Sequence, residues 1–325
     1  MTAVVAAMAV FAALLLPLPA SAQTAGYKNL ERGSFVIQYT DADMRTADMI
    51  ATDGPVAAKR LEADLGLDRL DTVTIFIAAD AKDYQEALGG KGTRPEWSAG
   101  VAYPSKSLIV LSPPRTVQPN GDRIDIFKIF VHELCHVLLQ RALNDRVPPD
   151  WLAEGLAKVE AGEWSFDMAT QLTGALLMGR LIPLHDLIHS FPGQESRARL
   201  AYAESMSFVS YLMTQTGVNG FQTFLARLAK GESMDSALRL TTGKELFDLE
   251  QDWRSYLLFH HTLISILGRS GFWWFLAAVL AFLAYLTVKI RSRRRLREME
   301  IEERRYYGDD EFHDPERHGP GGWVN

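Results

Sequence analysis

A run of 19 consecutive uncharged residues, from Ser270 to Val288, constrains the fold of this chain more than any other feature of its sequence. As a helix that rises about 1.5 Å per residue, the run is about 28 Å long, close to the thickness of the hydrocarbon core of a bilayer. Trp273 and Trp274 lie near one end, where tryptophan is typical of the membrane–water interface. The run therefore predicts one transmembrane helix over residues 270–288, which we favour over a buried core helix.

The residues that follow this run predict its orientation. Six of the nine residues from Lys289 to Arg297 are Lys or Arg, and these residue types are enriched on the cytoplasmic side of membrane helices. Residues 289–325 are therefore predicted to form a cytoplasmic tail, which we expect to be disordered because its end has no apolar period. A solvated tail is favoured, and a tail that binds a cytoplasmic partner is the alternative.

The N-terminus has the pattern of a secretory signal peptide over residues 1–22. An uncharged apolar run from Ala3 to Leu16 precedes Ala20-Ser21-Ala22, which forms an A-x-A cleavage site. The mature chain is predicted to begin at Gln23, and residues 23–268 are then translocated to the other side of the membrane. Both ends predict a single-pass protein of a bacterial-type cell membrane, with a periplasmic or extracellular N-terminal domain and a cytoplasmic C-terminus.

Composition narrows the class of the large domain between these segments. The chain holds 34 Lys and Arg against 40 Asp and Glu, a formal net charge of −6, whereas a general nucleic-acid binder would be basic. Hydrophobic residues make up 47% and charged residues 23% of the chain, which is typical of a globular protein. The single cysteine, Cys135, excludes an intramolecular disulfide and a zinc ribbon built from cysteines.

Hydrophobic periodicity predicts an α+β fold for this domain. Four strands are predicted at residues 35–39, 72–77, 99–103 and 108–111. Helices are predicted over residues 42–65, 81–88, 122–143, 150–162, 166–178, 199–216, 218–229, 233–240 and 244–266. The expected architecture is a small mixed β-sheet in the N-terminal half, packed on a mainly helical C-terminal half.

The motif that carries chemistry is His132-Glu133-Leu134-Cys135-His136, which has the pattern HExxH. Histidines at positions i and i+4 project from one face of a helix, so both imidazoles can bind one metal ion. The glutamate beside that face can accept a proton from a water molecule at the metal. The surrounding helix is apolar on most faces and is predicted to be buried. Buried polar side chains need partners, and a metal ion supplies one.

A third ligand, which a catalytic zinc site requires, is predicted in the next helix. Glu154 lies 18 positions after His136, within Asp150-Trp151-Leu152-Ala153-Glu154-Gly155-Leu156-Ala157. Pro148 and Pro149 predict a turn that allows the second helix to run back and bring Glu154 to the metal. By itself such a glutamate is an ordinary surface residue, but the preceding HExxH motif favours a ligand.

These motifs resemble those of the gluzincins, the zinc metallopeptidases with HExxH and a downstream glutamate. More narrowly, they resemble the peptidase MA-like domains of bacterial envelope proteins. The specific motifs are confined to residues 132–136, 151–157 and 201–209, and a looser resemblance covers residues 33–265. The resemblance implies a minimal zincin-like fold that hydrolyses a peptide or protein substrate with one Zn²⁺ per chain.

The resemblance also implies the roles of individual residues. His132, His136 and Glu154 would hold the zinc ion, and Glu133 would act as general base. Tyr202 is the candidate donor for the oxyanion of the transition state, because related enzymes often use a tyrosine or histidine from a downstream helix. A tyrosine that only packs in the core is the competing interpretation.

Two supporting features are left open by the sequence. Residues 108–111 are either the edge strand that pairs with an extended peptide or an interior strand. Several gluzincins also orient a histidine with an acidic residue four or seven positions after the third ligand, but Lys158 and Ala161 occupy those positions here, and Glu160 points away. Either another residue serves, with Glu204 as the candidate, or the site is poorly supported.

Three functions are compatible with these patterns. The favoured one is a membrane-anchored zinc metallopeptidase. The alternative is a catalytically inactive peptidase-like domain that acts as a binding or assembly module for envelope proteins, and the third is a metallohydrolase that acts on other bonds. The presence of all four residues His132, Glu133, His136 and Glu154 favours the enzyme, because a binding module does not need the complete set.

Overall fold

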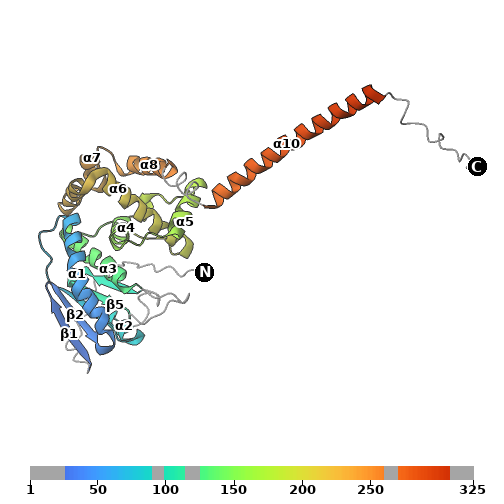
Figure 1. The fold of residues 1–325 in the computed structure, drawn as a ribbon. Coiled ribbons are helices and arrows are strands. Elements are labelled where there is room, and N and C mark those ends of the chain that lie inside the picture. Colours follow the sequence, from blue (N-terminus) through green and yellow to red (C-terminus); the bar gives the residue numbers. More distant parts are fainter. Residues whose placement is uncertain (1–25, 90–98, 114–124, 260–269, 308–325) are drawn as a thin grey trace, which may run out of the picture. The chain divides into compact units, whose positions relative to one another are not determined.

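The computed structural model describes residues 26–89, 99–113, 125–259 and 270–307 (Figure 1). The predicted signal peptide, residues 1–22, lies outside the described residues, as does the end of the predicted tail from residue 308 onward. The chain divides into two compact units, residues 1–261 and residues 262–325.

The first unit contains a mixed five-stranded sheet in the order β1-β2-β3-β5-β4. Its strands are β1 (Tyr27–Arg32), β2 (Phe35–Thr40), β3 (Val73–Ile77), β4 (Gly100–Tyr103) and β5 (Leu108–Leu111). The central pairs β2–β3 and β3–β5 are parallel, whereas β1 and β4 pair antiparallel with their neighbours. The four predicted strands are all present.

Strand β1 was not predicted from the sequence. Its residues, YKNLER, show no alternation of apolar and polar side chains, and all six are exposed or only partly buried. The strand is held by backbone pairing with β2 at the edge of the sheet and by the Tyr27 ring, which stacks on Phe76 with centroids 5.0 Å apart. Periodicity cannot detect a strand that buries neither face.

The two faces of the sheet pack against different helices, and the alternation of side chains along the strands separates them. Ile109 and Leu111 face the main core, which β2 and β5 share with α1 (Met44–Leu65) and α3 (Ile126–Ala142). Val110 faces the other way, into a small second core with Tyr84 of α2 (Ala81–Ala87). Helix α3, which contains HExxH, therefore lies directly on the sheet.

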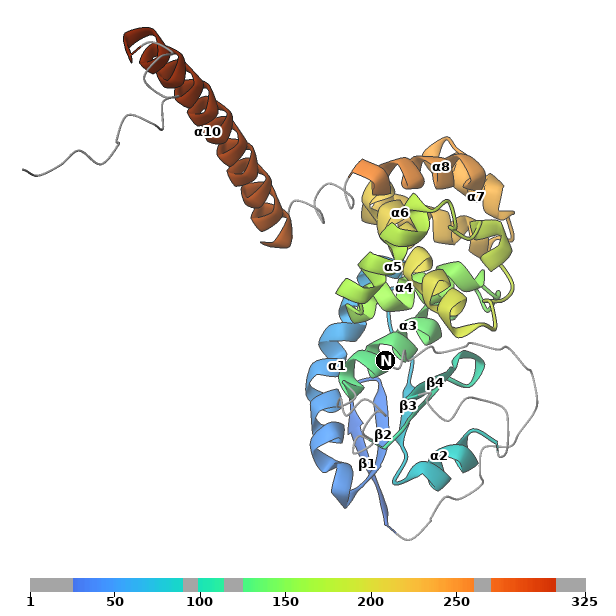
Figure 2. The same ribbon diagram turned by 90° about the vertical axis from the view of Figure 1, so that its right-hand side faces the viewer.

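The C-terminal half of this unit is helical and lies on the side of α3 that faces away from the sheet (Figure 2). Its helices are α4 (Asp150–Ala161), α5 (Phe166–Leu177), α6 (Glu195–Ala229), α7 (Met234–Thr242) and α8 (Leu246–Leu257). Short 3₁₀ turns occur at η1 (Asp41–Asp43), η2 (Pro104–Lys106) and η3 (Leu184–Leu187). The predicted division near residue 217 is confirmed, because Gly217 has non-helical angles (φ 64°, ψ 175°) inside α6. The α+β architecture is confirmed.

Helices α4 and α6 approach closely at Gly155. A Cβ atom at this position would lie 2.4 Å from the carbonyl oxygen of Ser205, far inside van der Waals contact. One turn before, Trp151 is fully buried and packs edge-to-face on Phe208 of α6, with centroids 5.2 Å apart. The glycine after Glu154 therefore allows α4 to lie against α6, which fixes the helix that carries Glu154.

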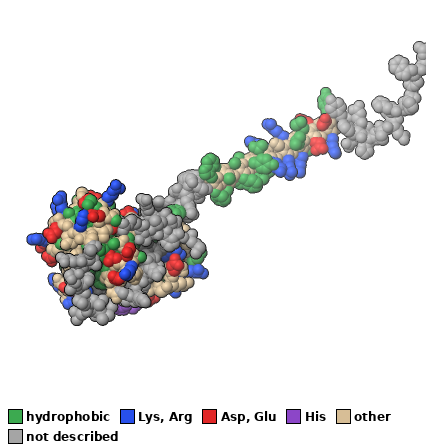
Figure 3. All heavy atoms as spheres, turned by 90° about the horizontal axis from the view of Figure 1, so that it is seen from below, with side chains coloured by type: hydrophobic (Ala, Val, Ile, Leu, Met, Phe, Trp, Pro, Cys, Tyr) green, Lys and Arg blue, Asp and Glu red, His purple; other side chains and the backbone are tan. Residues whose placement is uncertain are grey.

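The second unit contains α10 (Ser270–Tyr307), which is long and apolar enough to cross a membrane. Hydrophobic side chains cover its first part, and charged side chains follow along the second (Figure 3). The prediction of disorder from residue 289 is corrected over residues 289–307, which are helical. This segment is rich in Arg and Glu, which favour helix, and Glu300 and Arg304 have the i, i+4 spacing of a stabilising ion pair.

Candidate metal centre

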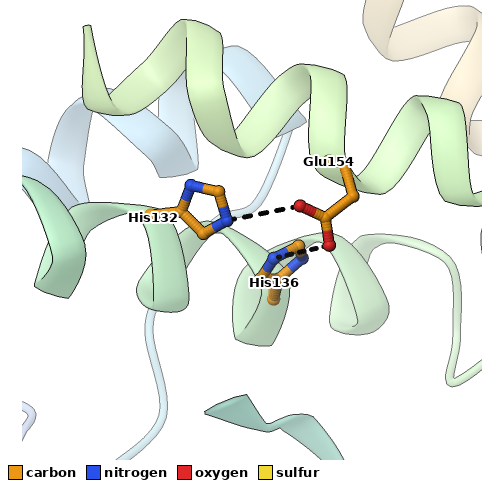
Figure 4. Close-up of side chains that lie close together, drawn as sticks. All are labelled: His132, His136 and Glu154. Carbon is orange, nitrogen blue, oxygen red and sulfur yellow. Dashed lines mark ion pairs between the residues drawn. The ribbon is translucent and has the colours of Figure 1, made fainter. Parts of the chain in front are cut away.

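Three side chains from two helices converge at the centre of the first unit. His132 and His136 project from α3 toward Glu154 of α4 (Figure 4). His132 Nε2 lies 3.6 Å from Glu154 Oε2, and His136 Nε2 lies 3.7 Å from Glu154 Oε1. One ligand atom from each of the three residues lies within 4.8 Å of the others. The structure thus brings together the three residues that the sequence predicted as ligands.

The polar atoms of this cluster that face one another are buried and lack hydrogen bonds. Exposed fractions are 3% for His132, 8% for His136 and 3% for Glu154. Among the described residues, neither Nε2 atom nor either oxygen of Glu154 has a hydrogen-bond partner. Four buried polar atoms that point at one another without hydrogen bonds are costly unless a cation lies between them. Two imidazoles and a carboxylate are the ligand set of catalytic zinc sites, so the residues fit this metal.

The local sequence explains why these side chains meet. The Asp125 carboxylate accepts a hydrogen bond from the Lys128 N–H and caps the start of α3, and the i, i+4 spacing then aligns both histidines. Asn144 and Asp145 adopt positive φ after α3, and α4 begins directly after Pro149. Cys135 is fully buried and is not a member of the cluster, as its position on the helix predicts.

Glu163 orients His132, a role that the sequence did not reveal. Its carboxylate lies 2.8 Å from His132 Nδ1 and 2.6 Å from the Lys158 ammonium. Burial raises the pKa of Glu163, but His132 and Lys158 outweigh burial and lower the pKa to about 2, so the carboxylate is ionised at neutral pH. A carboxylate on Nδ1 turns Nε2 of the same ring toward a metal.

The turn that ends α4 places Glu163. Gly162 adopts the left-handed conformation (φ 63°), its N–H donates to the Val159 carbonyl, and the Glu163 N–H donates to the Lys158 carbonyl. These two bonds form a Schellman motif, in which the chain folds back over the last helical turn. A search at helical spacing misses Glu163, because it lies beyond the helix. The signal in the sequence was Gly162, a typical glycine at a helix end.

The two other glutamates considered for this role have structural partners elsewhere. Glu160 pairs with Arg60 of α1, whose Nε lies 3.2 Å from Glu160 Oε2. Glu204 accepts the backbone N–H of Ile182 at 3.0 and 3.2 Å. Glu204 therefore holds the segment before η3 and does not orient a histidine.

Glu204 is expected to make the fold less stable at high pH. Burial raises the pKa of its carboxyl from the ordinary 4.5 to about 8. The contribution of the protonated carboxyl to the free energy of unfolding is therefore complete below about pH 4.5 and is lost as the pH rises toward 8. Glu204→Gln keeps an acceptor for Ile182 and should raise the free energy of unfolding at pH 8 by about 1 kcal/mol or more, with little change at pH 4.5. Denaturant titrations at both pH values measure this, with Glu245→Gln as the exposed control. An equal gain at both pH values would contradict the assignment.

Glu133 lies beside the three converging side chains, where α3 meets the sheet. It is 3% exposed and lines a small cavity of about 20 Å³ with His132 and Gly100. A Cβ atom at Gly100 would lie 2.9 Å from Glu133 Cγ and 2.5 Å from Ile129 Cγ2. Glycine at this position therefore lets β4 approach α3 at Glu133.

The strand nearest Glu133 is an edge strand. Of the two possibilities left open for residues 108–111, the structure shows the interior one, because β5 lies between β3 and β4. Among the described residues, β4 is the last strand at this side of the sheet, where it pairs antiparallel with β5.

Tyr202 lies on α6 and is buried, with 2% of its surface exposed. Its ring contacts Phe191 with centroids 4.7 Å apart, and the Lys158 ammonium lies 4.9 Å from its centroid. Burial, and then the carboxylates of Glu154 and its neighbours, raise the pKa of this phenol well above its ordinary value. The hydroxyl therefore keeps its proton and can act as a donor.

A hollow of about 350 Å³ adjoins the centre. Lys158 and Glu163 line both this hollow and the small cavity at Glu133, so the two are neighbours. The other lining residues come from α3, the turn after α4, α5 and α6: Lys128, Gly162, Trp164, Ser165, Asp167, Met168, Gln171, Arg199 and Tyr202. The hollow is large enough for a side chain of a bound peptide.

Comparison with protein families places most of the first unit in a known superfamily. The model described as Peptidase MA superfamily matches residues 51–259, which is more than half of the chain and includes HExxH and Glu154. Comparison with curated proteins gave no match.

Proposed function

The chain belongs to the Peptidase MA superfamily, and on this basis we propose that it is a membrane-anchored zinc metallopeptidase. The observation that carries the proposal is the buried cluster of His132, His136 and Glu154, whose inward-facing atoms have no hydrogen-bond partner among the described residues. Glu133, on the same helix, supplies the remaining residue that the chemistry requires. The proposed substrate is a peptide or protein.

The proposed metal is a single Zn²⁺ ion held by His132, His136 and Glu154. When bound, zinc supplies Lewis-acid chemistry that activates a water molecule and polarises a carbonyl. Glu163 keeps His132 in the tautomer with Nε2 free, and Lys158 keeps the Glu163 carboxylate in place through its 2.6 Å contact.

The remaining steps belong to side chains of this chain. Glu133 takes the proton of the attacking water as general base and passes it to the leaving amine. Tyr202 is proposed to donate a hydrogen bond to the oxyanion that develops in the transition state, which its protonated hydroxyl allows.

The topology proposed for the whole protein follows from both ends of the sequence. Residues 1–22 are removed as a signal peptide, α10 crosses the membrane, and the catalytic domain faces the periplasm or the cell exterior. The basic residues that follow Val288 support this orientation, because Lys and Arg are retained on the cytoplasmic side.

The direct test is digestion of a peptide library by the full-length protein in lipid nanodiscs. We expect cleavage that 1,10-phenanthroline abolishes and that added zinc restores. Cleavage that survives complete removal of metal would refute the metallopeptidase. A folded, zinc-loaded protein that cleaves no peptide would support the inactive binding module.

Glu163→Gln is expected to lower the affinity for zinc by about 10- to 100-fold, the usual effect of removing the partner of a histidine ligand. The amide keeps the shape of the side chain but loses the charge that His132 and Lys158 contact. Competition with a chelator of known affinity measures the change, and Asp167→Asn, in the same hollow, is the control. Unchanged affinity in Glu163→Gln would show that this carboxylate does not support the site.

A further inference from the structure

Lys158 is a buried lysine in the last turn of α4. Its side chain is only 5% exposed, although lysine is almost never buried this deeply unless its charge is paired. It lies four residues after Glu154, and this spacing places both side chains on the same face of the helix. The ammonium of Lys158 is therefore held inside the domain, on the side of α4 that carries the third predicted ligand.

Glu163 accounts for one contact of this ammonium. Its carboxylate lies 2.6 Å from Lys158 Nζ and 2.8 Å from His132 Nδ1. The contact pairs the charge, but it does not explain why the residue is a lysine. A neutral donor would also hold the carboxylate, without a positive charge that repels a metal ion nearby. A second group that requires a positive charge explains the lysine better.

The ring of Tyr202 on α6 is such a group. The ammonium of Lys158 lies over this ring, 4.9 Å from its centroid. The face of an aromatic ring attracts a cation, most strongly where water is excluded, and Tyr202 is 2% exposed. The Phe191 ring contacts the same ring at a steep angle, with centroids 4.7 Å apart. Together the two contacts restrict the rotation of the ring and thus the direction of its hydroxyl.

The hydroxyl of Tyr202 lies within electrostatic reach of the metal centre. After burial, carboxylates from α3, α4 and the turn after α4 raise the pKa of this phenol: Glu154, Asp150, Glu163 and Glu133. A donor to an oxyanion is effective when it is held in place before the charge develops, because it then needs no reorganisation. The orientation of this ring is therefore a property on which the proposed reaction depends.

We propose that Lys158 is a positioning residue, whose ammonium fixes the Tyr202 ring so that the hydroxyl stays directed at the metal centre. The same ammonium holds Glu163 on His132, so one side chain connects the support of a predicted zinc ligand to the donor for the oxyanion. The inference rests on the proposed peptidase function, and it adds a connection between α4 and α6 that the reaction requires.

The position of Tyr202 relative to the metal tests this connection without any substrate. The full-length protein, with ¹³C-labelled tyrosine rings, is loaded with Co²⁺ in lipid nanodiscs. The unpaired electrons of cobalt shift the NMR signals of nearby nuclei according to their distance and direction. The signal that disappears in Tyr202→Phe belongs to Tyr202. Lys158→Met removes the charge of the side chain, and Lys158→Arg keeps it. Lys128→Met is the control, at an exposed lysine that lines the same hollow.

We expect Lys158→Met to lose most of the cobalt-induced shift of the Tyr202 signal, and Lys158→Arg and Lys128→Met to keep it. An unchanged shift in Lys158→Met would overturn the proposal, because the ring would then be held without the lysine. A Tyr202 signal that cobalt does not shift in the wild type would overturn it as well. If Lys158→Met does not fold, Glu163→Gln is compared with Glu163→Gln/Lys158→Met, which leaves no carboxylate without its ammonium.

Peptide cleavage at saturating zinc gives a second readout. Lys158→Met should lower kcat by about 10- to 100-fold, the cost of a misplaced group, with little change in KM, because the donor acts only in the transition state. In Tyr202→Phe, which has no hydroxyl to position, Lys158→Met should cause little further loss. Equal losses in both backgrounds would overturn the proposal. A wild type that cleaves no peptide would refute the peptidase, and the cobalt measurement would still decide whether Lys158 holds the ring.

Discussion

Glu133→Gln is expected to lower the turnover of peptide cleavage by about 10²- to 10⁴-fold, the range that a general base contributes. The amide cannot accept the proton of the attacking water, whereas it occupies nearly the same volume in the cavity that Glu133 shares with Gly100. Because Glu133 is not one of the three converging side chains, the variant should still bind one zinc per chain. The measurements are kcat for a cleaved peptide and zinc content by elemental analysis.

Glu160→Gln is the matched control for this variant. It also neutralises a buried glutamate of the same domain, but one that contacts Arg60 away from the metal centre. We expect its turnover to stay near that of the wild type. If the Glu133→Gln protein keeps wild-type turnover, Glu133 is not the general base. If the variant loses zinc as well as turnover, Glu133 has a structural role at the metal site.

His136→Ala and Glu154→Ala are expected to abolish stable zinc binding, from about one ion per chain to a small residual fraction. Each change leaves two protein ligands, fewer than the three that a catalytic zinc site needs. Zinc binding should also raise the free energy of unfolding, because a ligand at 100 times its Kd stabilises a folded protein by about 2.7 kcal/mol. Added zinc should therefore raise the Tm of the wild type and leave the Tm of both variants unchanged.

His185→Ala provides the control for these two variants. His185 lies on η3, is exposed, and is not among the residues that converge on Glu154. It should retain about one zinc per chain and the full increase of Tm. If Glu154→Ala retains zinc and His136→Ala does not, the third ligand is not Glu154, and the two-histidine motif binds metal with another partner.

Much of the site was predictable because it depends on residues that lie close together in the sequence. The HExxH pattern needs only the geometry of one helix to align His132 and His136, and the two prolines before α4 indicate a turn short enough to return Glu154 to them. The strands that alternate apolar and polar residues were found for the same reason. Strand β1 was missed because its side chains are mostly polar and do not alternate, so that it is held mainly by pairing with β2.

The partner of His132 was not predictable from helical spacing. Glu163 lies nine positions after Glu154, where an uninterrupted helix would turn it 180° away from that ligand at about 100° per residue. The left-handed Gly162 ends the helix and folds the chain back, so Glu163 reaches His132 Nδ1. The pattern of the family directed attention to Lys158, which instead contacts the orienting carboxylate.

The sequence by itself predicted the three side chains that converge in the structure, His132, His136 and Glu154, and an apolar helix long enough to cross a membrane. Both predictions depend mainly on composition and on spacing along the sequence. Only the tertiary structure decided that β5 is an interior strand, that β4 lies beside Glu133, and that Glu163 contacts His132. Each of these depends on which elements become neighbours, and that depends on packing between segments far apart in the chain, such as Gly155 against Ser205. Periodicity records which side of a helix or strand is apolar, but it does not record what covers that side.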